Sequence, residues 1–176
     1  MDYIRIWKEV ILTPSNFYRR MPTTGGYADP LTFAIICLIV NTLLFALVRP
    51  TLLIMAGMHN LPSTLSMPST VSLMIISGII SLFISALIIN TLYKAFRGTG
   101  SYEGTFRFLC YSSAPIVFSW IPIVGLVIVI YELYLCIVGG MIVHNVSLKK
   151  STLLFFPFAL FSIYISIRTI LQSFAH

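Results

Sequence analysis

Long, nearly uninterrupted apolar segments constrain this chain more than any other feature of its sequence. Of its 176 residues, 58% are hydrophobic and only 9% are charged, which is more apolar surface than a soluble domain of this size can bury. A helix of roughly 20 apolar residues crosses ~30 Å of hydrocarbon, and backbone groups inside lipid must find their hydrogen bonds within the protein. The apolar runs lack the alternation of β-barrel strands. The sequence therefore predicts an all-α membrane protein.

The predicted fold is a bundle of five transmembrane helices preceded by short amphipathic interfacial helices. Residues 1–30 are expected to form a cytoplasmic amphipathic N-terminal segment, and residues 31–176 the transmembrane domain. Pro115 falls inside the third span, which we expect it to kink because proline removes a backbone donor. The expected spans cover residues 31–48, 70–93, 104–120, 123–143 and 151–173.

The N-terminal segment carries two helix patterns. Residues 2–13 are apolar on one helical side and charged on the other, too short and too charged to span but suited to the headgroup layer. Thr13-Pro14 then predicts the N-cap and first residue of a second short helix. The residues expected to anchor the segment at the membrane interface are Trp7, Arg19 and Arg20.

The basic residues predict the orientation of the bundle. Nine of the eleven fall on one predicted side: four before the first span, three between the second and third, and two between the fourth and fifth. Only Arg49 and Arg168 fall on the other side. Because basic loops stay cytoplasmic, we expect a cell-membrane protein with its N-terminus inside and its C-terminus outside. The net charge of +6 then indicates contact with the lipid bilayer rather than with nucleic acid.

Glu132 lies at the middle of the fourth predicted span, where an ionised carboxylate costs several kcal/mol unless it is paired or hydrated. Gly125 and Gly139 share its helical face and allow close helix packing, so we expect Glu132 to point into the bundle. Asn41 lies at a similar depth and is the expected hydrogen-bond partner. Two interpretations stay open. Glu132 is either a proton or cation site in a pathway, or a hydrogen-bonded carboxyl that holds helices together.

Other polar side chains fall inside the predicted spans. Asn90 and Tyr111 complete the predicted intramembrane polar site. Ser77, Ser81 and Ser85 recur at every fourth position, which predicts a helix-packing stripe; a polar permeation path is the alternative interpretation.

The sequence does not predict a catalytic site or a metal site. Cys37, Cys110 and Cys136 all fall in apolar runs without CxxC spacing, which favours buried thiols over a disulfide or metal site. The sequence has no HExxH, Walker A or GxSxG pattern. We therefore expect a protein that is not an enzyme and that needs no metal or cofactor.

Five short motifs follow one another along the chain: Pro14-Ser15-Asn16-Phe17-Tyr18, Gly25-Gly26-Tyr27-Ala28-Asp29-Pro30-Leu31, Gly98-Thr99-Gly100-Ser101-Tyr102, Tyr111-Ser112-Ser113-Ala114-Pro115 and Trp120-Ile121-Pro122-Ile123-Val124-Gly125. In their order and spacing, the residues from Trp7 to the end resemble the Yip-one domain family. Its members are five-span membrane proteins, and the eukaryotic ones interact with Ypt/Rab GTPases.

The resemblance implies a cytoplasmic N-terminus and a role in membrane traffic through protein partners. The eukaryotic relatives carry a long cytoplasmic region with an acidic Gly-Pro motif, whereas this chain resembles a compact prokaryotic member. We expect a protein that organises or recruits partners at the cytoplasmic face, with self-association as a further expectation. The alternative is a small transporter or channel for an ion, small solute or lipid that uses Glu132.

The five-span topology makes a labelling prediction. A cysteine introduced at Thr99 should react with a membrane-impermeant reagent only after permeabilisation, because Thr99 lies in a cytoplasmic turn. A cysteine introduced at Ser63 should react in intact cells. Labelling of both positions from the same side would contradict the topology.

Overall fold

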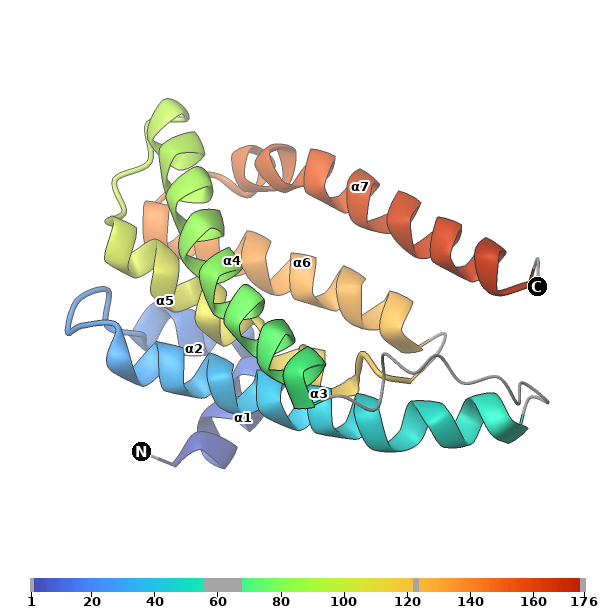
Figure 1. The fold of residues 1–176 in the computed structure, drawn as a ribbon. Coiled ribbons are helices and arrows are strands. Elements are labelled where there is room, and N and C mark those ends of the chain that lie inside the picture. Colours follow the sequence, from blue (N-terminus) through green and yellow to red (C-terminus); the bar gives the residue numbers. More distant parts are fainter. Residues whose placement is uncertain (1, 56–67, 122–123, 175–176) are drawn as a thin grey trace.

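The computed structural model describes residues 2–55, 68–121 and 124–174, and within these ranges the regular elements are all helical (Figure 1). Their order is α1 (Tyr3–Leu12), α2 (Pro14–Arg20), α3 (Ala28–Met55), α4 (Pro68–Ala95), α5 (Tyr102–Ser112), the 3-10 helix η2 (Ala114–Phe118), α6 (Val124–His144) and α7 (Leu148–Phe174). The all-α fold predicted from the sequence is confirmed.

Three helices are long and apolar enough to cross a membrane, judged by length and composition over the described residues: Ala28–Val48 in α3, Ser72–Ala95 in α4 and Val127–His144 in α6. α7 has 27 residues and a length of about 40 Å, enough to cross, but it is not among these three. A membrane-spanning bundle is therefore supported, whereas the predicted number of five spans is not confirmed.

The predicted third span is not one continuous helix. α5 ends at Ser112 after 11 residues, about 16 Å, which is half of a hydrocarbon core. η2 follows with Pro115 near its start. The cause is Pro115, which has no N–H to donate and whose ring clashes with the preceding helical turn. The sequence predicts a kink at this proline, and the structure shows a helix end instead.

The N-terminal helices pack against the bundle. The Trp7 indole Nε1 donates a 2.8 Å hydrogen bond to the Ala114 carbonyl, and its ring packs edge-on against Phe118. The Tyr131 hydroxyl donates to the Ile11 carbonyl. Val10 on α1 is fully buried. The amphipathic pattern of α1 is thus present, and the part of its apolar side that includes Trp7 and Val10 faces protein. Trp7 therefore contacts the bundle, and its predicted place at the membrane interface stays a prediction.

α2 is fixed by a buried tyrosine. The Ser112 hydroxyl donates to the Phe108 carbonyl, so the Tyr18 hydroxyl, 2.8 Å away, is the donor in the contact between Tyr18 and Ser112. Burial raises the pKa of Tyr18 well above its ordinary value, so this donor stays protonated at physiological pH. Arg19 and Arg20 lie at the end of α2 with exposed side chains. Pro14 begins the helix as predicted.

Residues near the start of α1 also approach α3. Tyr3 and Ile4 line a cavity of about 190 Å³ together with Cys37 and Val40. Val40 lies about 18 Å along α3 from Ala28. Because α3 is 28 residues, or about 42 Å, long, part of it can extend beyond ~30 Å of hydrocarbon and offer this contact surface.

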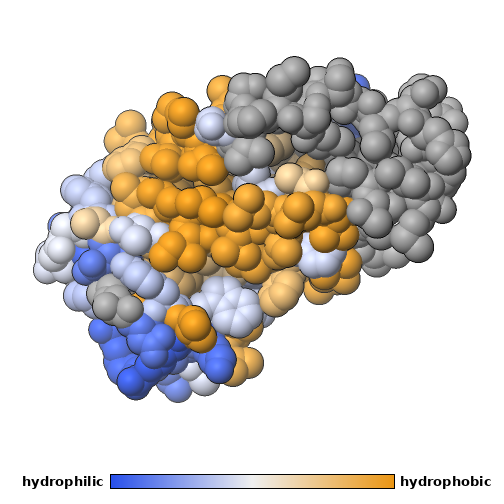
Figure 2. Space-filling view, turned by 60° about the horizontal axis from the view of Figure 1, so that its bottom comes forward, coloured by the Kyte–Doolittle hydropathy of each residue, from blue (hydrophilic) through white to orange (hydrophobic). Residues whose placement is uncertain are grey.

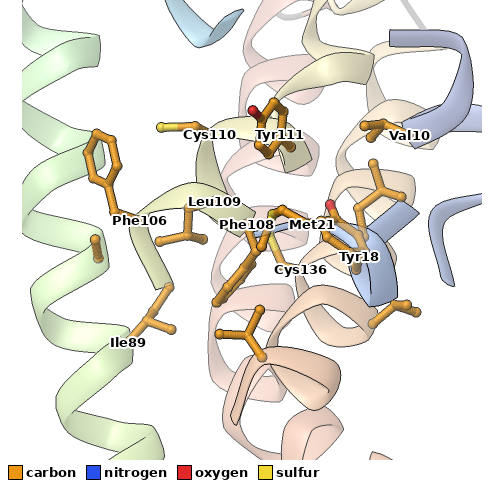
Figure 3. Packing of buried hydrophobic residues seen from close by; sticks show 14 of the residues in the cluster. Val10, Tyr18, Met21, Ile89, Phe106, Phe108, Leu109, Cys110, Tyr111 and Cys136 are labelled. Carbon is orange, nitrogen blue, oxygen red and sulfur yellow. The ribbon is translucent and has the colours of Figure 1, made fainter. Parts of the chain in front are cut away.

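α5 forms the centre of the core. Nine of its residues, from Gly104 to Ser112, are buried. Figure 3 shows its side chains reaching in several directions, with Phe106 toward α4 and Phe108 toward Cys136 on α6. Burial of such side chains stabilises by roughly 1.5–3 kcal/mol each. Through these buried contacts, α5 connects the N-terminal helices α1 and α2 with the long helices of the bundle.

The outer surface is apolar over much of its area. Figure 2 shows a broad band of hydrophobic residues beside a hydrophilic end. Large hydrophobic side chains are exposed on the long helices, including Leu43, Leu73, Ile84, Val127 and Leu160. Apolar side chains outside and hydrogen-bonded polar groups inside suit a protein that is surrounded by lipid.

Gly140 supplies the stability test for this packing. A Cβ on Gly140 would overlap the Tyr93 hydroxyl, which is held 2.6 Å from Ser151 Oγ. Gly140→Ala should therefore destabilise the protein by about 1–3 kcal/mol, measured by unfolding in detergent. Gly78→Ala is the control, since its Cβ would meet only the flexible tip of Leu38. Equal unfolding free energies for both variants would contradict this packing.

Candidate functional site

A cavity of about 330 Å³ surrounds Glu132, between helices α4, α5, α6 and α7. Its polar lining groups are Glu132, Ser81, Ser85 and Cys136, and the remaining lining is aliphatic or aromatic. α6 directs Glu132 into the bundle, as the sequence suggests. Glu132 shares this cavity with Ser81 and Ser85. The sequence indicates the buried carboxylate and the serine stripe only as separate features.

The Glu132 carboxylate has no hydrogen-bond or ion-pair partner among the described residues. Ser81 Oγ donates to Gly78 O of its own helix at 2.8 Å, and Ser77 Oγ likewise bonds back to Met74 O. The serines therefore do not join helices through these hydrogen bonds. A carboxylate in a cavity with two hydroxyl groups can hold a proton, a cation or a hydroxylated ligand.

Asn41 lies away from this cavity. Its carbonyl Oδ1 accepts a 2.9 Å hydrogen bond from Ser119 Oγ, because α3 packs beside the segment that follows η2. The predicted pairing of Asn41 with Glu132 is thus not present. Gly125 lies near the same place, where a Cβ would come within 3.0 Å of the Ser119 carbonyl.

Asn90 and Tyr111 also lie in separate surroundings. Asn90 Oδ1 accepts from Thr105 Oγ1 at 3.3 Å. The Tyr111 ring packs against Phe17, with ring centroids 5.0 Å apart. Gly139 faces α5, and a Cβ there would stand 3.0 Å from the Phe108 ring. The four predicted intramembrane polar residues consequently belong to different sites, because helix depth alone does not determine which faces meet.

A buried polar network near Asn90 was not predicted. Thr105 Oγ1 lies 2.8 Å from His144 Nε2. The His144 ring stacks on Tyr93 with centroids 4.1 Å apart, and Tyr93 bonds to Ser151. The burial of His144, at the end of α6, was not predicted from the sequence. The signal in the sequence is the polar stretch that follows the apolar run.

Glycines bring the 98–101 turn onto this network. A Cβ on Gly100 would lie 2.7 Å from His144 Nδ1, and one on Gly98 would lie 2.9 Å from the Tyr93 carbonyl. The Thr99 N–H donates to the His144 carbonyl at 3.0 Å. The turn motif is therefore explained by close backbone approach.

A second unpredicted cluster surrounds Arg107. Its side chain is only 3% exposed. Arg107 Nη1 donates to the Gly26 carbonyl at 2.6 Å, and the Gly26 N–H donates to Glu103 Oε1 at 2.6 Å. Arg107 and Glu103 also form an i,i+4 ion pair at 3.4 Å. Gly25 and Gly26 have φ of +117° and +90°, which L side chains rarely adopt. The adjacent glycines in the sequence were the signal from which this loop conformation could have been predicted.

These clusters hold one end of the molecule together. The Gly25-Gly26 loop, the 98–101 turn, the start of α5 and the end of α6 are joined by hydrogen bonds. Over the described ranges, no group of three or more His, Cys, Asp or Glu side chains is placed to hold a metal ion. The three cysteines are free and buried. The arrangement therefore provides a hydrogen-bonded end and a separate polar cavity.

An apolar exterior, long helices and internal polar networks define an α-helical membrane protein with three candidate spanning helices among the described residues. The family model for the Yip1 domain matches residues 8–168. The chain belongs to this family, and the resemblance drawn from the motifs is confirmed. Comparisons with curated proteins and with solved structures gave no match.

Proposed function

We propose that this Yip1-domain protein is a non-enzymatic membrane scaffold that recruits protein partners, in membrane traffic or membrane organisation, at its cytoplasmic side. The observation that carries the proposal is the docking of α1 and α2 on the bundle through Trp7, Val10 and Tyr18. Docked helices present a fixed surface, so a partner does not have to order them upon binding.

The outward surface of α1 and α2, which we call the N-terminal face, has the composition of a protein-binding surface. It exposes basic side chains at Arg5, Lys8 and Arg19. Beside them lies the apolar side chain of Leu12, which is 75% exposed. Exposed apolar side chains bordered by charge are typical of interaction sites, and the basic charge favours an acidic partner surface.

Photo-crosslinking tests the scaffold. A crosslinking amino acid at Lys8 or Leu12 should give discrete protein adducts, whereas the same group at the exposed apolar Leu160 of α7 should give mainly lipid adducts. Trp7→Ala combined with Tyr18→Phe removes two hydrogen bonds that dock α1 and α2, and should abolish the adducts. An adduct of twice the chain mass would identify a second copy as the partner. Equal protein adducts from Leu160, or adducts unchanged by undocking, would contradict the proposal.

A second candidate function rests on the Glu132 cavity. We propose a pathway for a proton or small cation, supported by a membrane-embedded carboxylate without a described partner and by two neighbouring serines. A carboxylate that served only to hold helices together would be expected to bond across them.

Flux measurements test this second candidate. Wild-type protein in liposomes should dissipate an imposed proton or sodium gradient, and Glu132→Gln should remove that flux while the fold persists, because the amide cannot carry the charge. Ser77→Ala is the matched control, since Ser77 does not line the cavity. Absence of flux in the wild type would exclude the pathway and leave the scaffold proposal untouched.

A further inference from the structure

A second polar cavity, of about 220 Å³, lies between α1, α2 and α5. It is many times larger than the ~10–15 Å³ that one water molecule needs. Its charged lining groups are Glu9, Arg20 and Arg107, and Ile6, Phe17 and Tyr111 provide apolar walls. Neither the scaffold proposal nor the Glu132 pathway uses this cavity.

Arg107 forms the inner wall of the cavity and is incompletely bonded. Its Nη1 is occupied by the Gly26 carbonyl and by Glu103. Its Nε is buried without a hydrogen-bond partner among the described residues. A buried donor left unsatisfied is destabilising, and more so when it is charged. The guanidinium thus has one edge fixed by the protein and an Nε donor that lacks an acceptor.

Arg20 supplies a second guanidinium to the cavity lining. Its Nη2 lies 3.1 Å from Glu9 Oε2, while Glu9 Oε1 is 3.0 Å from Arg5 Nε. Glu9 therefore pairs with Arg20 at the cavity lining. Glu103, on the other edge of Arg107, faces the Gly26 N–H. The cavity combines two guanidinium groups with one carboxylate that an incoming anion could replace.

We propose that this cavity binds a phosphate-type oxyanion, either the headgroup phosphate of an anionic lipid or free phosphate. Guanidinium forks match phosphate oxygens bidentately, and both Arg20 and Arg107 line this cavity. Ile6, Phe17 and Tyr111 suit the glycerol and upper acyl carbons of a lipid, and the basic charge of the segment attracts anionic lipid. On binding, the phosphate accepts from Arg107 and takes the place of Glu9 at Arg20.

The test uses the full-length protein in neutral detergent, with phosphatidylglycerol and inorganic phosphate as separate probes. Lipid binding is measured by native mass spectrometry and phosphate binding by calorimetry. Arg20→Gln should weaken binding about fivefold, since one basic group near such an anion contributes about 1 kcal/mol. Glu9→Gln should strengthen it by a similar factor because the competing carboxylate is gone. Arg19→Gln, an equal change of charge on the exposed neighbour, should leave the affinity nearly unchanged.

Each outcome decides the proposal. Saturable binding of phosphatidylglycerol alone identifies the lipid as the source of the phosphate, and binding of inorganic phosphate as well identifies a general oxyanion site. Binding of neither probe would overturn the proposal. So would an equal loss in Arg19→Gln and Arg20→Gln, or a weakening in Glu9→Gln. These variants avoid Arg107 itself, whose replacement could unfold the core.

Discussion

α5 ends at Ser112 because Pro115 cannot continue it, and the rest of the fold is arranged around this short buried helix. In a continuous helix, the backbone carbonyls around residue 114 would accept hydrogen bonds from later N–H groups of the same helix. Here the Ala114 carbonyl accepts from Trp7, and Ser112 accepts from Tyr18. The interruption therefore leaves the Ala114 carbonyl available to Trp7 of α1, while α3, α4 and α6 enclose the other sides of α5.

The two ends of this arrangement have different chemistry. Near the start of α5, Thr105 bonds to His144, and Arg107 bonds to Gly26 and Glu103, while Arg107 Nε and His144 Nδ1 have no partner among the described residues. Such pairing fixes the loops and favours a preorganised surface. At Glu132 the carboxylate meets a cavity instead. Because an unpaired charge is costly in lipid, a site of this kind is more easily explained by a ligand or proton than by packing.

Much of the architecture could be predicted from composition and periodicity. The apolar runs indicate helices in a membrane, and Thr13-Pro14 locates the start of α2 because proline suits a first helical turn. The family could also be inferred, since Gly25-Gly26 and the 98–101 turn retain motifs that the structure explains by positive φ and by close approach to His144. These are local constraints, which a single sequence can express.

The contacts between distant segments could not be predicted. The apolar side of α1 suits lipid and protein equally well, so nothing in its pattern reveals that Trp7 meets Ala114, 107 positions away. Likewise, Asn41 and Glu132 lie at similar depths on their helices, but depth does not specify rotation, and Asn41 faces Ser119. The sequence predicts only a kink at Pro115, whereas the helix ends there. A single sequence does not reveal that other helices pack around the short α5.

The central claim is that α1 and α2 are part of the folded bundle rather than a surface attachment. Hydrogen–deuterium exchange of the full chain in lipid nanodiscs tests it most directly. Docked helices exchange only when a larger unit of structure opens. Amides within Tyr3–Leu12 and after Pro14 in α2 should therefore be protected to a degree comparable with α5, and Tyr18→Phe with Trp7→Ala should reduce that protection selectively. Rapid exchange of both helices in the wild type, beside a protected α5, would contradict the account.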